Sequence, residues 1–162
     1  MLAVGKNHFK RDQMYEKELN EKLRKIKNYQ GSFAIDELNE ISLSKLPSFF
    51  VINMDRRISN GSHWIAIAVY MNNVYVCDPL GGIIPDNVQP QPLIDFLDTI
   101  LTTRKLNMTC QLQPSYSDLC GHYCVLFVKE MDQNNCFKCF LNLFSRDKND
   151  NDEIVKFLNK QI

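Results

Sequence analysis

The chain lacks any apolar run of the roughly 20 residues that a membrane-spanning helix requires. Its 19 lysines and arginines are balanced by 19 acidic residues, so the net charge gives no argument for a nucleic-acid or anionic membrane partner. The first four residues are apolar, but Lys6 follows too soon for the core of a secretory signal. We therefore expect an intracellular protein without a membrane partner.

The sequence also lacks internal repeats and any linker long enough to separate two domains. A length of 162 residues suits one domain with one core, and we expect it to act as a monomer. Residues 12–28 are highly charged, with Leu19, Leu23 and Ile26 spaced for one face of a helix. We therefore divide the chain into an N-terminal helical segment, residues 1–28, and a core, residues 29–162.

Strand and helix patterns alternate through the core, which predicts the α+β class. Runs of β-branched and aromatic residues predict strands, and apolar residues at helical spacing predict helices. The tetrapeptide 29–32 should end the first helix, and Ser117 or Asp118 should cap a buried helix that follows. We expect strands at 48–54, 63–71, 74–78 and 108–113, with helices at 35–41, 91–106, 118–131 and 153–159.

Six cysteines without a secretory signal suggest free thiols, metal ligands or a catalytic thiol rather than a disulfide framework. Cys120 falls in the first turn of the predicted buried helix. The positive end of a helix dipole lowers the pKa of a thiol there and favours the reactive thiolate. Gly121 beside it should leave the nucleophile open to an approaching substrate backbone. Cys120 is therefore our candidate nucleophile.

Only three histidines are available as a general base. His122 is two residues from Cys120 and points to another helix face, and His8 lies in a charged N-terminal stretch. His63 begins a predicted strand, where its side chain can reach over the edge of the sheet. Asp78 ends the strand that should pair with it in an antiparallel hairpin, which would bring the two together.

Acyl transfer also needs hydrogen-bond donors for the developing oxyanion, each worth about 3 kcal/mol. Gln113 lies seven residues before Cys120, on the loop that enters its helix. Its side-chain amide would act there beside the Cys120 backbone N–H.

Four motifs occur in order: Gly-Ser-His63-Trp64, Val-Cys-Asp78-Pro-Leu-Gly, Gln113, and Ser-Asp-Leu-Cys120-Gly121-His-Tyr-Cys. Over residues 29–127 they resemble the adenovirus-type maturation proteases (adenain) and the wider clan of ubiquitin-like protein proteases. The resemblance implies a central mixed sheet flanked by helices. It makes Cys120 the nucleophile, His63 the base, Asp78 the third member of the triad and Gln113 the oxyanion donor. Trp64 would form one side of the site, next to the histidine.

The chain differs from adenain in having Asp in place of Glu and in being shorter, like the compact proteases of virophages and virus-like DNA transposons. The resemblance implies an endopeptidase that cleaves after Gly-Gly or Gly-X-Gly sequences through a thioester acyl-enzyme. Its substrates would be capsid precursor proteins, and the enzyme would be packaged in the virion. No cofactor is needed for the chemistry, although an activating peptide or DNA is implied by resemblance.

Other interpretations stay open at this point. A ubiquitin-like-protein deconjugating enzyme would share every catalytic residue. The spacings Cys120-x3-Cys124 and Cys136-x2-Cys139 also suit a non-catalytic zinc-binding module, although we expect no metal site. Cys124 would be the nucleophile instead of Cys120, a redox partner of Cys120, or core filler, and Cys77 and Cys110 should be core filler. Basic residues that could touch nucleic acid gather near the first helix: Lys22, Arg24, Lys25 and Lys27.

Overall fold

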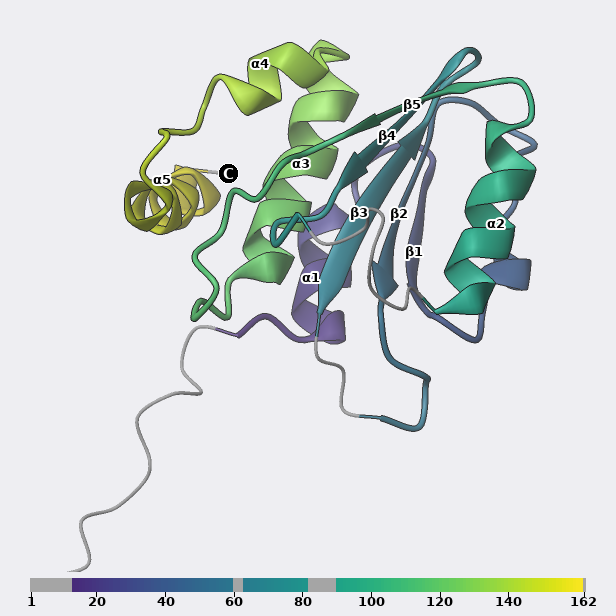
Figure 1. Ribbon diagram of the computed structural model, residues 1–162, viewed down its shortest axis with the longest axis horizontal. Coiled ribbons are helices and arrows are strands. Elements are labelled where there is room, and N and C mark those ends of the chain that lie inside the picture. The colour runs from purple at the N-terminus through teal and green to yellow at the C-terminus, as the bar shows by residue number, and fades with distance from the viewer. Residues whose placement is uncertain (1–12, 60–62, 82–89, 162) are drawn as a thin grey trace, which may run out of the picture.

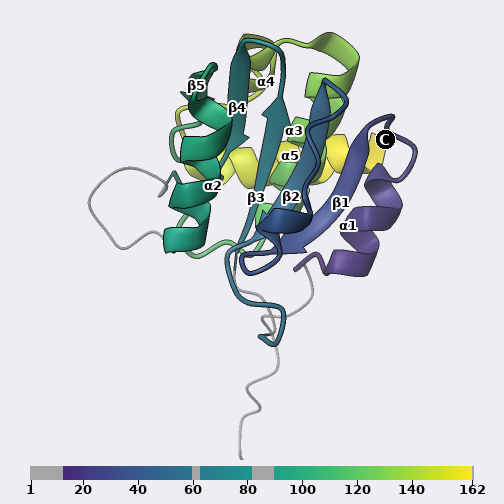
Figure 2. The ribbon, with the colours of Figure 1, turned by 90° about the vertical axis from the view of Figure 1, so that its right-hand side faces the viewer.

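The computed structural model describes residues 13–59, 63–81 and 90–161. It contains a five-stranded mixed sheet in the spatial order β1-β2-β3-β4-β5, with helices on both faces (Figures 1 and 2). The strands are β1 (Tyr29–Ala34), β2 (Ser48–Asn53), β3 (Trp64–Val69), β4 (Asn73–Cys77) and β5 (Lys105–Met108). The helices are α1 (Glu16–Leu23), α2 (Gln91–Leu101), α3 (Cys120–Asn134), α4 (Phe137–Leu141) and α5 (Lys148–Gln161), with a 3-10 turn η1 (Leu38–Glu40).

The two faces of the sheet carry different layers. Helices α1, α3, α4 and α5 lie on one side, and α2 with η1 lies on the other (Figure 1). All six residues of β3 are buried because both faces of this strand are covered. The residues facing α3 include the small Ala66 and Ala68, whereas Ile65 and Ile67 face α2. Small side chains under α3 let this helix lie close to the sheet.

Pairing along the sheet combines two antiparallel and two parallel ladders. Strands β2, β3 and β4 form an antiparallel meander, and the outer strands β1 and β5 pair in parallel with β2 and β4. In the β3–β4 hairpin, Ala66 lies opposite Cys77 and Val69 opposite Val74. This confirms the predicted hairpin, and the architecture confirms the α+β class. Within the described residues, no helix has the length and apolar character needed to cross a membrane.

Several boundaries differ from the sequence-based expectations. Residues 29–34 form the edge strand β1 rather than a break, and its pairing is irregular between Tyr29 and Ser32 around Gly31, which has a φ of +117°. Its polar residues and glycine do not show the apolar pattern by which a strand is predicted, because an edge strand buries little of its length. Strand β5 begins at Lys105 and ends at Met108, so most of the predicted strand 108–113 is loop. Helix α4 was not predicted, and α5 begins five residues before the expected Glu153.

A turn at Gly81 brings the segment that follows Asp78 against the loop that carries Gln113. Gly81 has a φ of +69°, and a Cβ built on it would lie 2.5 Å from the backbone N of Gln111. The carbonyl oxygen of Pro79 accepts hydrogen bonds from the backbone N–H groups of Leu112 and Gln113, both at 2.9 Å. The loop that carries Gln113 is therefore seated directly on the turn that follows Asp78, and only glycine permits this close approach.

We predict that Gly81→Ala destabilises the fold more than Gly31→Ala does. Both positions have positive φ, which costs a residue with a Cβ roughly 1–2 kcal/mol. Gly31 has open space around it, whereas at Gly81 the new methyl group meets backbone atoms, adding about 1–3 kcal/mol. Urea unfolding of the two variants measures the difference. Equal losses of unfolding free energy would show that the loop moves aside without cost.

Candidate active site

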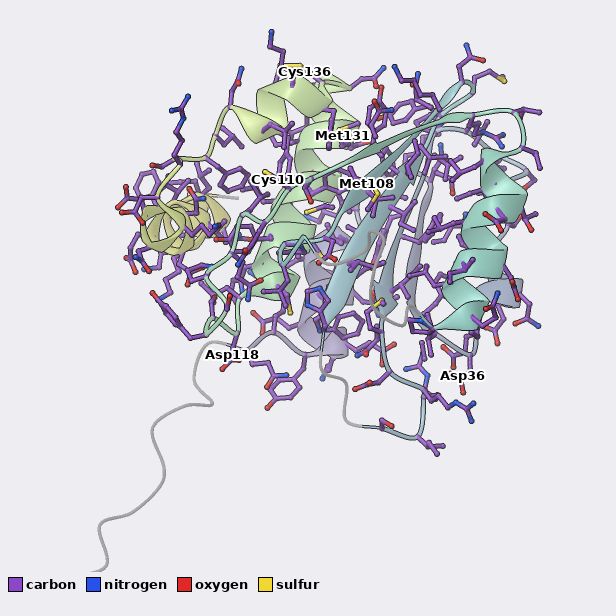
Figure 3. All side chains as sticks on the ribbon, viewed as in Figure 1. Asp36, Met108, Cys110, Asp118, Met131 and Cys136 are labelled. Carbon is purple, nitrogen blue, oxygen red and sulfur yellow. A yellow bond between two sulfur atoms is a disulfide. The ribbon has the colours of Figure 1, made fainter. Side chains whose placement is uncertain are left out.

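Three chain segments converge at one end of the sheet. His63 immediately precedes β3, Asp78 immediately follows β4, and Cys120 is the first residue of α3. Because β3 and β4 are antiparallel, the start of one strand lies beside the end of the other. Helix α3 packs on β3 with its N-terminus at that same end. Figure 3 shows Asp118, just before α3, at the end of the sheet opposite to Cys136.

His63 and Asp78 form a direct, largely buried pair. The Nε2 atom of His63 lies 2.7 Å from Oδ1 of Asp78, and the exposed fractions of the two side chains are 17% and 3%. The same carboxylate oxygen accepts a hydrogen bond from the backbone N–H of Leu80 at 3.1 Å. The Thr109 hydroxyl donates to the Asp78 carbonyl oxygen and accepts from its N–H, at 2.9 and 3.0 Å. Asp78 is thereby fixed in one position, and it fixes the histidine ring.

The pairing changes the ionisation of His63. Burial by itself lowers the pKa of an imidazole, but hydrogen bonds to Asp78 and to the Cys120 thiol outweigh it and raise the pKa of His63 from 6.5 to about 9. The Cys120 thiol is close enough to the ring to contribute to this rise, and Nε2 is already taken by Asp78. At neutral pH the ring is therefore protonated, with the Asp78 carboxylate on one side.

Cys120 is buried, with 6% of its surface exposed, and lies at the positive end of a 15-residue helix. The prediction that Ser117 or Asp118 caps this helix is wrong: the N-cap position is Leu119, and no described side chain caps it. The Ser117 hydroxyl instead accepts a hydrogen bond from the Leu119 N–H at 3.2 Å. Within the described residues the backbone N–H of Cys120 has no acceptor, so it remains available to a bound oxyanion.

Gln113 lies in the same neighbourhood but makes other contacts. Its side chain is 1% exposed, and its Nε2 donates a hydrogen bond to the carbonyl oxygen of Ser117. Among the described residues, its Oε1 atom has no hydrogen-bond partner. The side chain therefore braces the loop just before Cys120 with one of its two amide hydrogens. Its role as an oxyanion donor stays a prediction, for which the second amide hydrogen is available.

Trp64 and Gly121 meet a residue that sequence reasoning missed, Met14. The Trp64 indole N–H donates to the Met14 carbonyl oxygen at 3.2 Å, and Met14 is 1% exposed. A Cβ on Gly121 would lie 2.9 Å from the Met14 Cβ and 3.5 Å from Trp64 Cδ1. The expectation that Gly121 leaves open space for a substrate is therefore wrong, because Met14 fills that space. A single methionine before a charged helix gives no sequence signal of this contact.

A cleft of about 310 Å³ opens beside this cluster. Met14, Trp64, Arg56 and Arg57 are among its lining residues, and Trp64 follows His63 in the chain, whereas His63, Asp78 and Cys120 do not line it. The predicted motif residues Gly61 and Ser62, and the rejected base His8, lie outside the described residues.

The other cysteines do not form a metal site in the described part of the chain. Cys77 and Cys124 are fully buried, and burial raises the pKa of both thiols, as expected for core residues. Cys110 is exposed beyond the end of β5, so its predicted place in the core is wrong. Cys136 and Cys139 form a disulfide where the chain enters α4. No three metal-ligating side chains gather among residues 13–59, 63–81 and 90–161, and the disulfide takes up two of the four cysteines of the zinc interpretation.

No protein-family model and no curated protein sequence matches this chain. Solved structures do match. The ASFV pS273R protease is similar at 16% sequence identity with a TM-score of 0.64, over 90% of this chain and 65% of that one. The central domain of the Lpg1148 protein from Legionella pneumophila is similar at 14% identity with a TM-score of 0.52, over 93% and 96% of the two chains. This chain spans less than two thirds of the pS273R protease. The described residues thus have the α+β fold of a cysteine protease.

Proposed function

We propose that this protein is a cysteine endopeptidase with Cys120 as its nucleophile. The observation that carries the proposal is the buried His63–Asp78 pair, 2.7 Å between Nε2 and Oδ1, with its imidazole in contact with a thiol at a helix N-terminus. A core cysteine needs neither the histidine nor the helix end, and Cys124, one turn further along α3, has neither. The similarity to a viral protease supports the fold of such an enzyme.

The proposed reaction proceeds in two steps. The Cys120 thiolate attacks the carbonyl carbon of the scissile peptide, forming a C–S bond and a tetrahedral oxyanion. His63 gives its proton to the leaving amine, the C–N bond breaks, and a thioester remains. Neutral His63 then takes a proton from water, whose oxygen attacks the thioester, and the acid product leaves as Cys120 recovers its thiolate. Asp78 holds the ring in place through both steps.

Two donors would stabilise the oxyanion in our proposal. The backbone N–H of Cys120 has no acceptor among the described residues, and Gln113 has an amide hydrogen beyond the one bound to Ser117. The Gln113 backbone is held by the carbonyl oxygen of Pro79, and its side chain is bonded to Ser117, three residues before Cys120. The donors are thus positioned before substrate arrives, which is what makes such a site effective.

The proposed substrate is a polypeptide with small residues at the cleavage site. Met14 packs on Gly121 beside the nucleophile, and this crowding favours glycine next to the scissile bond. The resemblance to adenain and to the compact proteases of virophages extends the proposal to capsid precursors cleaved after Gly-Gly or Gly-X-Gly in a maturing virion. Activation by a peptide or by DNA, and contact of the basic residues near α1 with nucleic acid, also remain proposals from that resemblance and from the charge pattern.

We predict that Cys120→Ala abolishes cleavage of a fluorogenic peptide ending in Leu-X-Gly-Gly, lowering kcat by about a thousandfold or more. Cys124→Ala is the matched control, because it removes a thiol from the same helix face one turn away and should leave most of the activity. Iodoacetamide should label Cys120 in the native protein and spare Cys124, whose buried thiol stays protonated. Loss of activity only in Cys124→Ala would refute the assignment.

Comparing cleavage of a capsid-derived peptide with cleavage of a ubiquitin-like fusion protein would then separate a maturation protease from a deconjugating enzyme.

The His63–Asp78 pair predicts a defined pH dependence. Below about pH 9 His63 carries the proton needed by the leaving amine, so kcat/KM should fall as pH rises through about 9. Asp78→Asn removes a carboxylate that raises the pKa of His63. Burial, which lowers this pKa, is then less fully offset, so kcat/KM should fall at a lower pH. A pH profile of both proteins measures the shift. An unchanged alkaline limb would mean that another group controls it.

The same shift has a consequence for stability. Because the folded pKa of His63 lies above its ordinary value of 6.5, the pair stabilises the fold fully below pH 6.5 and loses this contribution as pH rises through about 9. We expect the unfolding free energy of the wild type to drop by about 3 kcal/mol over that window. In Asp78→Asn the drop should be smaller. Urea titrations at pH 6 and pH 10 measure it without requiring activity.

We predict that Gln113→Ala lowers kcat about a hundredfold with little change in KM, as expected for loss of a donor that acts mainly in the transition state. Gln111→Ala is the control, because Gln111 lies in the same loop and bonds to the Gln113 carbonyl oxygen and to Ser115. If Gln113 only braces the loop, its removal should instead lower unfolding stability and reduce the rate of iodoacetamide labelling at Cys120.

A further inference from the structure

The segment just before α1 covers the start of α3. Residues 13–16, which we call the strap, include Met14, whose side chain is buried against Gly121. The Met14 carbonyl oxygen accepts the indole N–H of Trp64. Trp64 follows the proposed base, and Gly121 follows the proposed nucleophile. The strap therefore forms one wall of the proposed active site, and residues 13–16 all line the cleft beside it.

A single ion pair ties the strap to the loop that leads to His63. Glu16 is the last residue of the strap and the first of α1, and its Oε2 lies 2.7 Å from a terminal nitrogen of Arg57. Its other carboxylate oxygen accepts a hydrogen bond from the Ser32 hydroxyl at 2.9 Å. Arg57 belongs to the connection between β2 and β3. The wall of the cleft and the approach to the base are thus linked through one guanidinium group.

Arg57 is itself held from the opposite side. Its Nε and second terminal nitrogen bind the two carboxylate oxygens of Glu37, at 2.6 and 2.5 Å. Its backbone N–H donates to Asp36 at 2.9 Å. A planar guanidinium bound to both oxygens of one carboxylate has little freedom to turn. Its remaining terminal nitrogen is therefore aimed at Glu16, and this geometry fixes where the strap can lie.

We propose that Arg57 is a positioning residue that holds the strap closed over Trp64 and Gly121 and so sets the width of the substrate cleft. This inference rests on the proposed protease function. Arg57 does not touch the reacting atoms, and it acts through Glu16 and the strap. Its removal should widen the cleft and weaken substrate binding while the buried His63–Asp78 pair continues to work.

The test compares Arg57→Ala with Arg146→Ala, an exposed arginine in the loop before α5, outside the cleft. For the Leu-X-Gly-Gly peptide, KM should rise about fivefold in Arg57→Ala, as expected for loss of an exposed ion pair, and kcat should stay within about twofold. Arg146→Ala should change neither. Glu16→Gln should give the same rise in KM without disturbing Glu37, and combining it with Arg57→Ala should add little more. Arg57→Lys should recover part of the loss.

Hydrogen exchange tests the strap without relying on activity. In Arg57→Ala and Glu16→Gln, the amides of residues 13–16 should exchange faster, and those of α3 should be unchanged. A rise in KM without faster exchange would overturn the proposal, because Arg57 would then contact substrate directly. Unchanged KM and unchanged exchange would overturn it as well. If the wild type cleaves no peptide but the exchange changes as expected, the strap closure stands and the protease assignment falls.

Discussion

The antiparallel register between β3 and β4 is the constraint on which the site depends. It places residue 63, just before β3, and residue 78, just after β4, at the same end of the two strands. Both side chains belong to positions just outside the ladder, so they are free to turn towards α3 rather than follow the alternation of the strands. The small residues Ala66 and Ala68 then let α3 approach closely enough for Cys120 to meet the ring. A slip of one residue in this register would shift residue 78 along the strand direction relative to residue 63 and break their 2.7 Å contact.

Much of this arrangement was predictable because its signals are local. The hairpin turns at adjacent asparagines between two runs of β-branched residues, and Ala66 opposite Cys77 follows from that turn. The helix that starts at Cys120 is marked by a long apolar run, so the thiol's place in its first turn needed no tertiary information. With two of three histidines set aside by position, the sequence named His63, Asp78 and Cys120 as candidates, and the structure places the three near one another.

What was missed depends on contacts between distant parts of the chain. Met14 reaches Gly121 across more than a hundred residues, and nothing in the sequence around either residue indicates it. Thr109 holds the backbone of Asp78 from the end of β5, a strand that the sequence placed several residues too late. Strand β1 is an edge strand with a glycine and polar residues, and its pairing with β2 comes from the sheet rather than from its own propensity. The local sequence pattern predicts the helices and strands, whereas the contacts between them depend on how the strands pair in the sheet.

The two halves of the site differ in how firmly they are held. On one side, burying an imidazolium and a carboxylate costs desolvation energy, which the short ion pair and the hydrogen bond from the Leu80 N–H to the carboxylate offset, while Thr109 holds the Asp78 backbone. These contacts are buried and do not depend on substrate. On the other side, the strap is secured through Arg57, whose ion pair with Glu16 is partly exposed and therefore weak and sensitive to salt. The His63–Asp78 pair is thus held by buried contacts, whereas displacing the strap would cost little free energy. In the proposed endopeptidase this division would keep the reacting groups fixed while the substrate enters as an extended chain.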